Sequence, residues 1–245
     1  MWERDRLARA RLAAAAGTLV AKALREVWTP NDPQGSFAEF VSVALPIVRV
    51  TSRQANEISR LQFSTRAEPG AWRPYERSAD QIASGFWATG WRSLEAERPL
   101  AVAQSLVLGV AARQVTSASQ QSVIDSLRRS RIRAAYLLVN GSNPCWFCAM
   151  LASRGPVFQD DSFDESDPRF VGPGTARVHD NCGCSLVVVN TRESTEMATW
   201  QELEQQWKDV TGEVTGQAKL VAWRDHWNST HTKPKVPRWS QFASA

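Results

Sequence analysis

Two short clusters hold all four cysteines of this 245-residue chain. The first is a Cys-x-x-Cys pair, Cys145 and Cys148, and the second, 30 residues further on, brings together His179, Cys182 and Cys184. Thiolates and an imidazole at such spacings are typical ligands of tetrahedral zinc. Five candidates compete for four positions. Either the first pair and His179 bind with one of the last two cysteines, or all four cysteines bind and His179 does not.

The segment between the clusters gives zinc a structural task. Residues 159–176 are polar, carry five carboxylates and are interrupted by Pro and Gly, so they have too few apolar side chains to fold around a core of their own. Closing a loop of this length costs about 3–4 kcal/mol, whereas a structural zinc contributes about 10–16 kcal/mol at neutral pH. The sequence therefore predicts a closed structural zinc site that leaves no coordination position for a substrate.

Three other uses of these side chains stay open. Disulfides need an oxidising compartment, and the first residues do not resemble a secretion signal, so synthesis in the cytoplasm is expected. A cysteine nucleophile would pair Cys145 or Cys182 with His179 as its base. The thiols could also be unligated core residues. Four clustered thiols favour a metal over each of these.

The rest of the chain has mostly helical periodicity. Capping boxes are predicted at Ser36 with Glu39 and at Ser78 with Gln81, and Pro46 should bend or split the helix that contains it. Two tryptophans one turn apart, Trp87 and Trp91, are interpreted as core residues. Helices are predicted over 3–28, from 36, from 78, over 99–111 and 120–130, 195–210 and 217–227, and strands over 132–139 and 185–189.

These elements predict an α+β protein that is mainly α. We expect a helical basic region over 1–130, a small mixed α/β module with the Cys/His zinc site over 131–192, C-terminal helices over 193–231 and a flexible tail over 232–245. No run of 18 apolar residues occurs, so no membrane partner is expected. Two further histidines, His226 and His231, lack the spacing of a helical metal pair and are interpreted as surface or packing residues.

The charge of the chain is unevenly distributed. Residues 1–140 contain 19 Arg and Lys against 12 Asp and Glu, whereas residues 141–245 contain 10 against 13. Such asymmetry indicates that the first half faces an anionic partner, although solvated helix faces explain it equally well. Two groups of arginines carry the positive charge: Arg4, Arg6, Arg9 and Arg11, expected to give the first helix a positive surface, and Arg128, Arg129, Arg131 and Arg133, candidates for contacts with DNA phosphates.

Residues 131–189 resemble a known signature. The run from Arg131 to Val139, the segment Cys145–Gly155 and the segment Val178–Cys184 are together similar to the C-terminal signature of MuF-like minor head proteins of tailed phages. Members from phages of actinobacteria resemble it most, which fits the excess of Arg over Lys. The helical first half agrees with that family only in general character.

The resemblance implies a minor capsid protein that takes part in phage head morphogenesis. Its partners would be the portal and the major capsid protein, and packaged DNA is a further candidate through the second arginine group. It implies a place in the capsid interior of the virion, reached from the host cytoplasm, and no small-molecule substrate. Related chains are also described as capsid maturation proteases, for which Cys145, His179 and Cys182 are the candidate catalytic residues. A DNA-binding packaging factor is a third, weaker hypothesis.

Overall fold

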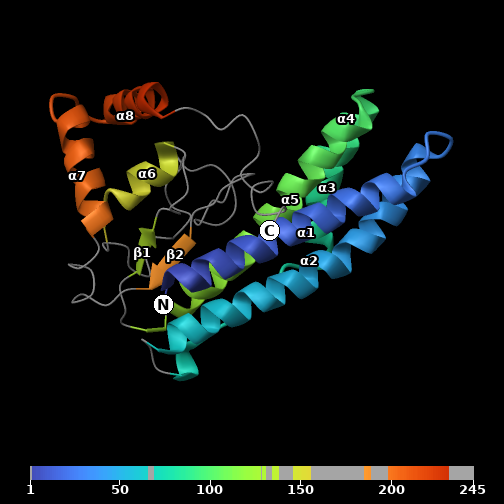
Figure 1. Ribbon diagram of the computed structural model, residues 1–245, viewed down its shortest axis with the longest axis horizontal. Helices are drawn as coiled ribbons and strands as arrows, with labels where there is room; N and C mark the ends of the chain where they lie inside the picture. The colour runs from blue at the N-terminus through green and yellow to red at the C-terminus, as the bar shows by residue number, and fades with distance from the viewer. Residues whose placement is uncertain are drawn as a thin grey trace.

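Three long helices form the body of the protein. The computed structural model describes residues 2–65, 69–127, 129–130, 134–137, 146–155, 185–188 and 198–231. Helices α1 (Trp2–Val27), α2 (Pro33–Ser64) and α5 (Leu100–Leu127) each contact the other two, and Figure 1 shows α1 and α2 running side by side in opposite directions. Their lengths of 26, 32 and 28 residues correspond to rods of about 40–50 Å.

A shorter helical rod completes the bundle. Helix α3 (Ala79–Phe86), a π-helical turn (Trp87–Trp91) and α4 (Arg92–Glu95) follow one another without a break and pack against α2 and α5. The chain therefore passes up, down, up and down through α1, α2, the α3–α4 rod and α5 (Figure 1). The predicted helices at 99–111 and 120–130 are parts of a single helix, α5.

Aromatic rings fill the bundle where the rod meets α2. The ring of Phe37 lies 4.8 Å from that of Trp87 and 5.6 Å from that of Trp91, and Phe40 contacts Phe86 at 5.4 Å. Gly90 permits this approach, because a Cβ there would lie 2.5 Å from a methyl group of Val107. The interpretation of the two tryptophans as core residues is confirmed, since both pack against the buried cluster.

One of the two predicted capping boxes is present and the other is not. The capping box at Ser78 is present, with Gln81 N donating to the Ser78 hydroxyl and Ser78 N donating to the Gln81 side chain. The box at Ser36 is wrong: Asp32 caps α2 and accepts from Gly35 N, while Ser36 is already inside the helix and buried. Pro at the first helical position favours the earlier start. Helix α2 also continues through Pro46, so the predicted split does not occur.

The arginines of α1 do not form the expected positive surface. Arg6 is fully buried and Arg9 is 7% exposed, because they lie on the same helix face as the core residues Ala13, Ala16 and Val20. The Arg9 guanidinium donates to Ser59 Oγ at 2.9 Å and to Gln62 Oε1 at 3.1 Å, and its Nη2 has no acceptor. Burial lowers the pKa of Arg9 to about 10, which leaves it charged at neutral pH.

An extended segment, residues 72–78, lies between α2 and α5, and we call it the strap. The 3-10 turn Pro69–Ala71 precedes it. Its backbone N–H groups at Arg73 and Tyr75 donate to the hydroxyls of Ser126 and Ser122, both at 2.8 Å, and Asn56 of α2 donates to Tyr75 O at 2.9 Å. The buried serines of α5 thus satisfy backbone donors that no sheet partner reaches.

A second, smaller cluster lies beyond the bundle. Helices α6 (Trp146–Ala152), α7 (Ala198–Thr211) and α8 (Gln217–Thr230) share a core of their own (Figure 1), whose buried members are Ala149, Met150, Ala152, Leu203, Trp223 and Trp227. Only α7 and α8 were predicted as long helices, and their bounds agree with the prediction to within about three residues.

The predicted α+β class is wrong, because the described residues form an all-α protein. Strands are present at Ala134–Leu137 (β1) and Ser185–Val188 (β2), inside both predicted ranges, but these four-residue strands pair antiparallel only with each other. Two such short strands do not make a sheet layer. The described part of 131–192 therefore does not form the predicted mixed α/β module. No group of three His, Cys, Asp or Glu side chains gathers among the described residues.

In the part of the chain that the structure describes, no helix combines the length and apolar character that a bilayer span requires.

Candidate functional site

Helix α6 carries Cys148, the one candidate ligand whose surroundings the structure describes. Its side chain is 5% exposed, so α6 turns this thiol inward. The other four candidates, Cys145, His179, Cys182 and Cys184, lie outside the described residues.

Two described elements next to the cysteine clusters contact the same strand. Helix α6 begins at Trp146, directly after Cys145 in sequence, and it packs against β1. Strand β2 begins at Ser185, directly after Cys184 in sequence, and Ser185 pairs with Leu137 of β1. The fold therefore brings α6 and β2, which are far apart in sequence, to one strand.

The start of α6 is held by a tryptophan from the other end of the chain. Trp223 of α8 is fully buried, and its indole Nε1 donates to the backbone oxygen of Trp146 at 2.8 Å. The ring of Trp223 also packs on those of Trp207, at 5.4 Å, and Trp227, at 5.3 Å. The carbonyl of Trp146, which directly follows Cys145 in sequence, is therefore held by a part-buried hydrogen bond next to an apolar core.

Another tryptophan, Trp200, contacts the chain just after the end of α6. The helix ends at Ala152, and Gly155 follows with a positive φ of 62°. A Cβ at Gly155 would lie 2.7 Å from the ring of Trp200 at the start of α7, so only glycine fits both the backbone conformation and the contact. Both ends of the helix that bears Cys148 are thus held by tryptophans of the C-terminal helices.

The remaining histidines take no part in this site. His231 stacks on Trp227 with ring centroids 3.7 Å apart and planes 7° apart, and His226 packs against Trp223 at 6.1 Å. The interpretation of His226 and His231 as packing residues is confirmed.

The second arginine group is largely outside the described residues. Arg129 is exposed just after α5, whereas Arg128, Arg131 and Arg133 cannot be placed. Two features escaped the sequence analysis: the burial of Arg6 and Arg9, and the contact of α8 with α6. The first had a signal, because Arg6, Arg9, Ala13 and Ala16 follow helical spacing. The second had none, since it joins residues 77 apart.

What the structure describes of this site is a buried thiol, that of Cys148, on a helix held near both of its ends. Among the described residues, no group of three His, Cys, Asp or Glu side chains gathers around it.

No curated protein and no solved structure matches the chain. One family model, described as VG15 protein, matches residues 2–210, which include the whole bundle, both cysteine clusters and nearly all of α7 but not α8. The chain therefore belongs to the VG15 protein family, a family of phage proteins.

Proposed function

We propose that this protein is a structural minor capsid protein of a tailed phage, associated with the portal and the interior of the capsid during head morphogenesis. Its role would be to make contacts through its long helical bundle, while a structural zinc joins the two cysteine clusters. The observation that carries the zinc proposal is the meeting of α6 and β2 on β1, which places the neighbours of both clusters at one strand.

Cys148 fits a structural zinc site. It is buried, it lies in the first turn of a helix fixed at both ends, and its neighbour in the Cys-x-x-Cys pair directly precedes that helix. Cys145, Cys148 and His179 would bind the ion with Cys182 or Cys184, or the four cysteines would bind it alone. Zinc thiolate bonds would supply the binding energy that ties the intervening polar segment to the fold.

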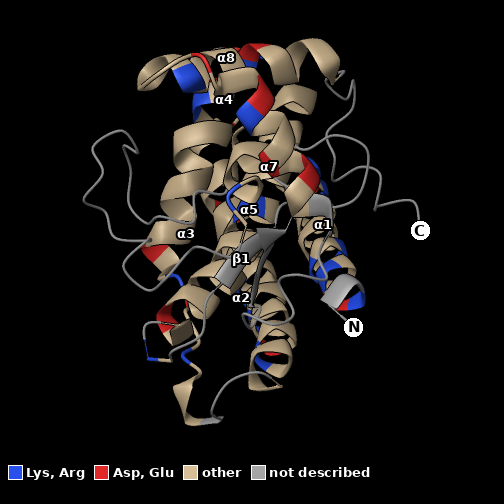
Figure 2. Ribbon diagram, turned by 90° about the vertical axis from the view of Figure 1, so that its left-hand side faces the viewer, with Lys and Arg blue, Asp and Glu red and all other residues tan. Residues whose placement is uncertain are grey.

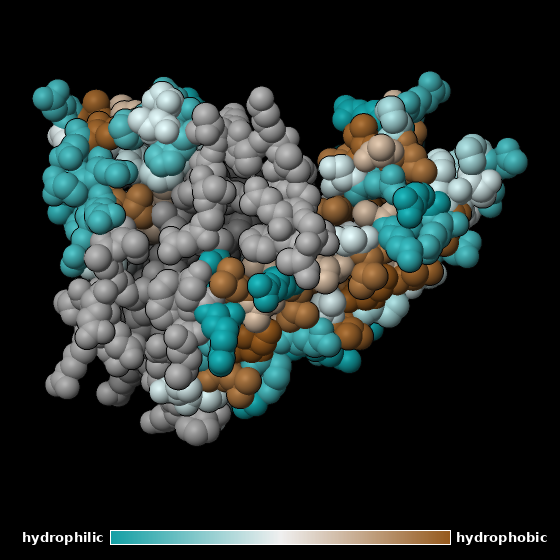
Figure 3. All heavy atoms as spheres, viewed as in Figure 1, coloured by the Kyte–Doolittle hydropathy of each residue, from teal (hydrophilic) through white to brown (hydrophobic). Residues whose placement is uncertain are grey.

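The bundle offers a surface suited to protein contacts. Helix α2 exposes Val43, Val50 and Leu61, at 39%, 52% and 57%, and their spacing of seven and eleven residues places them on one side of the helix. Figure 3 shows apolar side chains gathered along α1 and α2 on the face turned to the viewer. A line of exposed apolar groups on a long helix is typical of a surface that is covered in an assembly.

Metal analysis tests the zinc proposal. Protein purified under reducing conditions without chelator should contain about one zinc per chain. Cys148→Ala should lose it, as should His179→Ala if the histidine is a ligand, and comparison of Cys182→Ala with Cys184→Ala identifies the fourth ligand. His226→Ala is the matched control and should keep its zinc. Metal-free wild-type protein that unfolds no more easily than the loaded protein would exclude a structural zinc.

Head assembly tests the structural role. Co-expression with the portal and major capsid protein should give heads that contain this protein, and Val50→Asp with Leu61→Asp should reduce its incorporation without changing its unfolding. Asp substitutions at the exposed positions Gln206 of α7 and Ala218 of α8, outside α1 and α2, serve as controls. Capsid chains should stay full length. A specific cleavage that disappears in Cys145→Ser would instead assign a cysteine protease.

A further inference from the structure

The strap and its surroundings form a basic surface that shares only Arg129 with the second arginine group of the sequence. It lies at the end of the bundle where α5 finishes, and Figure 2 shows Arg and Lys positions on the segment that leads into α3. We call this surface the strap patch. Its described arginines come from four segments and are Arg49, Arg53, Arg60, Arg73, Arg77, Arg113 and Arg129.

The strap brings these arginines together because it is bonded to both neighbouring helices. The N–H of Arg73 donates to Ser126 Oγ, three residues before Arg129, which joins the strap to the end of α5. Four residues further along the strap, Arg77 lies close enough to Arg113 for each charge to oppose the other, and burial together with this repulsion lowers the pKa of Arg77. Among the described residues, no acceptor lies within hydrogen-bond distance of the Nε of Arg77.

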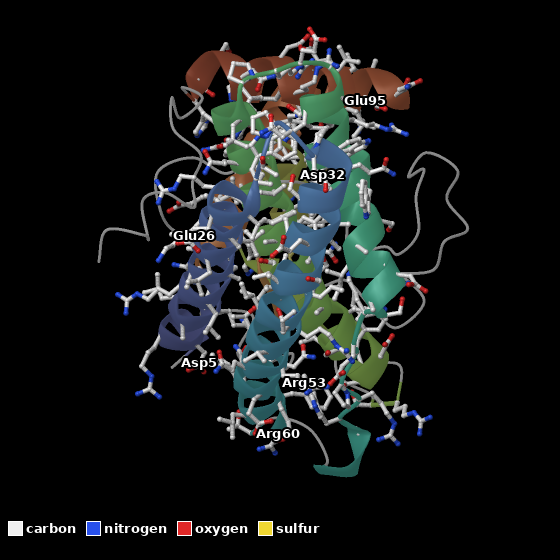
Figure 4. All side chains as sticks on the ribbon, turned by 90° about the vertical axis from the view of Figure 1, so that its right-hand side faces the viewer. Asp5, Glu26, Asp32, Arg53, Arg60 and Glu95 are labelled. Carbon is white, nitrogen blue, oxygen red and sulfur yellow. The ribbon has the colours of Figure 1, made fainter. Side chains whose placement is uncertain are left out.

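On the α2 side the patch contains ion pairs and further positive charge. Glu76 of the strap accepts from Arg53 at 2.8 and 3.1 Å and also feels the charge of Arg49. Arg60 is paired with Glu57 on the same helix. Figure 4 shows Arg53 and Arg60 at one end of α2, with Asp32 and Glu95 at the opposite end of the bundle.

Carboxylates lie near these arginines too. Glu57 and Glu76 are engaged as above, Asp125 accepts from Gln121 at 2.9 Å, and Asp80 is exposed in the first turn of α3, two residues after the strap. Seven arginines against these four carboxylates leave an excess of three positive charges. The surface is therefore basic even when its ion pairs are counted.

We propose that the strap patch binds the phosphate backbone of duplex DNA. Arg113 to Arg129 span about 24 Å along α5, which corresponds to about seven base pairs of duplex. All seven cations are arginines, whose planar guanidinium groups donate in pairs to phosphate oxygens. Contacts to phosphate oxygens carry no sequence information, so this binding should be independent of base sequence and should depend on salt.

Salt-dependent binding tests the proposal. The full-length protein should bind a fluorescent 20-base-pair duplex at low salt, and log K should fall linearly with log salt concentration. The triple variant Arg49→Gln, Arg73→Gln and Arg129→Gln should lower the steepness of that line by about two to three, close to 0.9 for each phosphate that is no longer neutralised. The Arg73 side chain also donates to the backbone oxygens of Gly70 and Trp72, so its replacement removes local hydrogen bonds as well as a charge. The double variant Arg49→Gln and Arg129→Gln keeps Arg73 and should lower the steepness by about two.

The control variant removes three exposed arginines at the other end of the bundle, Arg25, Arg92 and Arg98. It changes the net charge equally and should leave the salt dependence nearly as in the wild type. Equal effects of both triple variants would show that only net charge matters and would overturn the proposal, as would the absence of any complex at low salt. Unchanged DNA binding with loss of incorporation into heads would assign the patch to an acidic protein instead.

Discussion

The indole N–H of Trp223 donates to the backbone oxygen of Trp146 at 2.8 Å, across 77 residues of sequence. This bond links α8, which the VG15 family model does not include, to the start of the helix that carries Cys148. The C-terminal helix is therefore part of what holds the helix of Cys148 in place.

Trp223→Phe should destabilise the protein by about 1 kcal/mol, because the ring packing is kept and one buried hydrogen bond is removed. Urea unfolding measures the change. Trp207→Phe is the matched control, since no hydrogen bond of the Trp207 indole occurs among the described residues, and it should cost less. If Trp223→Phe also lowers zinc content, the bond positions the site; equal costs for both variants would contradict its importance.

Gly155→Ala should destabilise the protein more than Gly216→Ala. Both glycines have a positive φ, 62° and 58°, so both substitutions strain the backbone. Only at Gly155 does the new methyl group meet a ring, that of Trp200 at 2.7 Å, whereas nothing lies within 4 Å at Gly216. Thermal unfolding of the two variants compares them directly. Equal midpoints would show that the Trp200 contact adds nothing.

Arg9→Met and Gln62→Leu should each destabilise the bundle by about 1–3 kcal/mol, because each leaves a buried partner without its hydrogen bond. The double variant replaces both polar groups, so its loss of stability should be smaller than the sum of the single losses, with a coupling of about 0.5–3 kcal/mol. Unfolding free energies from a double-mutant cycle measure the coupling. Strict additivity would mean that the two side chains do not interact.

The burial of Arg9 predicts that the unfolding free energy of the protein changes with pH in the alkaline range. Burial lowers the pKa of Arg9 from the ordinary value of an arginine to about 10, so at pH values above about 10 the unfolded chain binds more protons than the folded one. The unfolding free energy of the wild type should therefore rise relative to that of Arg9→Met as the pH passes above about 10. Urea unfolding of both proteins from about pH 9 to about pH 11 tests the sign. Parallel curves would contradict the burial of the charge.

Asn56→Ala should loosen the strap, whereas Glu76→Gln should not. Asn56 is buried, donates to Tyr75 O and accepts from Ser122, so its loss should cost about 1–3 kcal/mol. The pair of Glu76 with Arg53 is half exposed, and such pairs contribute little. Its hydrogen bond lowers the pKa of Glu76, so any contribution is present above the ordinary pKa of a Glu and disappears as the pH falls.

Hydrogen exchange at the backbone amides of Arg73 and Tyr75 distinguishes the two variants. Exchange should become faster in Asn56→Ala and stay unchanged in Glu76→Gln. Faster exchange in Glu76→Gln alone would show that the ion pair holds the strap in place.

Local signals in the sequence determined most of the helices, because helical spacing, a capping box and a helix-terminating Pro act over a few residues. The box at Ser78 formed as expected, and both predicted strands appeared at 134–137 and 185–188. The spacing of the cysteines and His179 predicts a zinc site. This site stays a prediction, because four of its five candidate ligands lie outside the described part of the chain.

Tertiary packing decided which side chains are buried and which distant elements touch, because burial depends on which helix faces pack against each other. It turned Arg9 inward against Ser59 and Gln62, where sequence alone suggested a solvated charge. It reduced the expected mixed module to two short strands and a helix, because no further strand among the described residues extends the ladder. It also joined Trp223 to Trp146, a contact that no local pattern encodes, since its energy comes from burying both residues in a core shared by three helices.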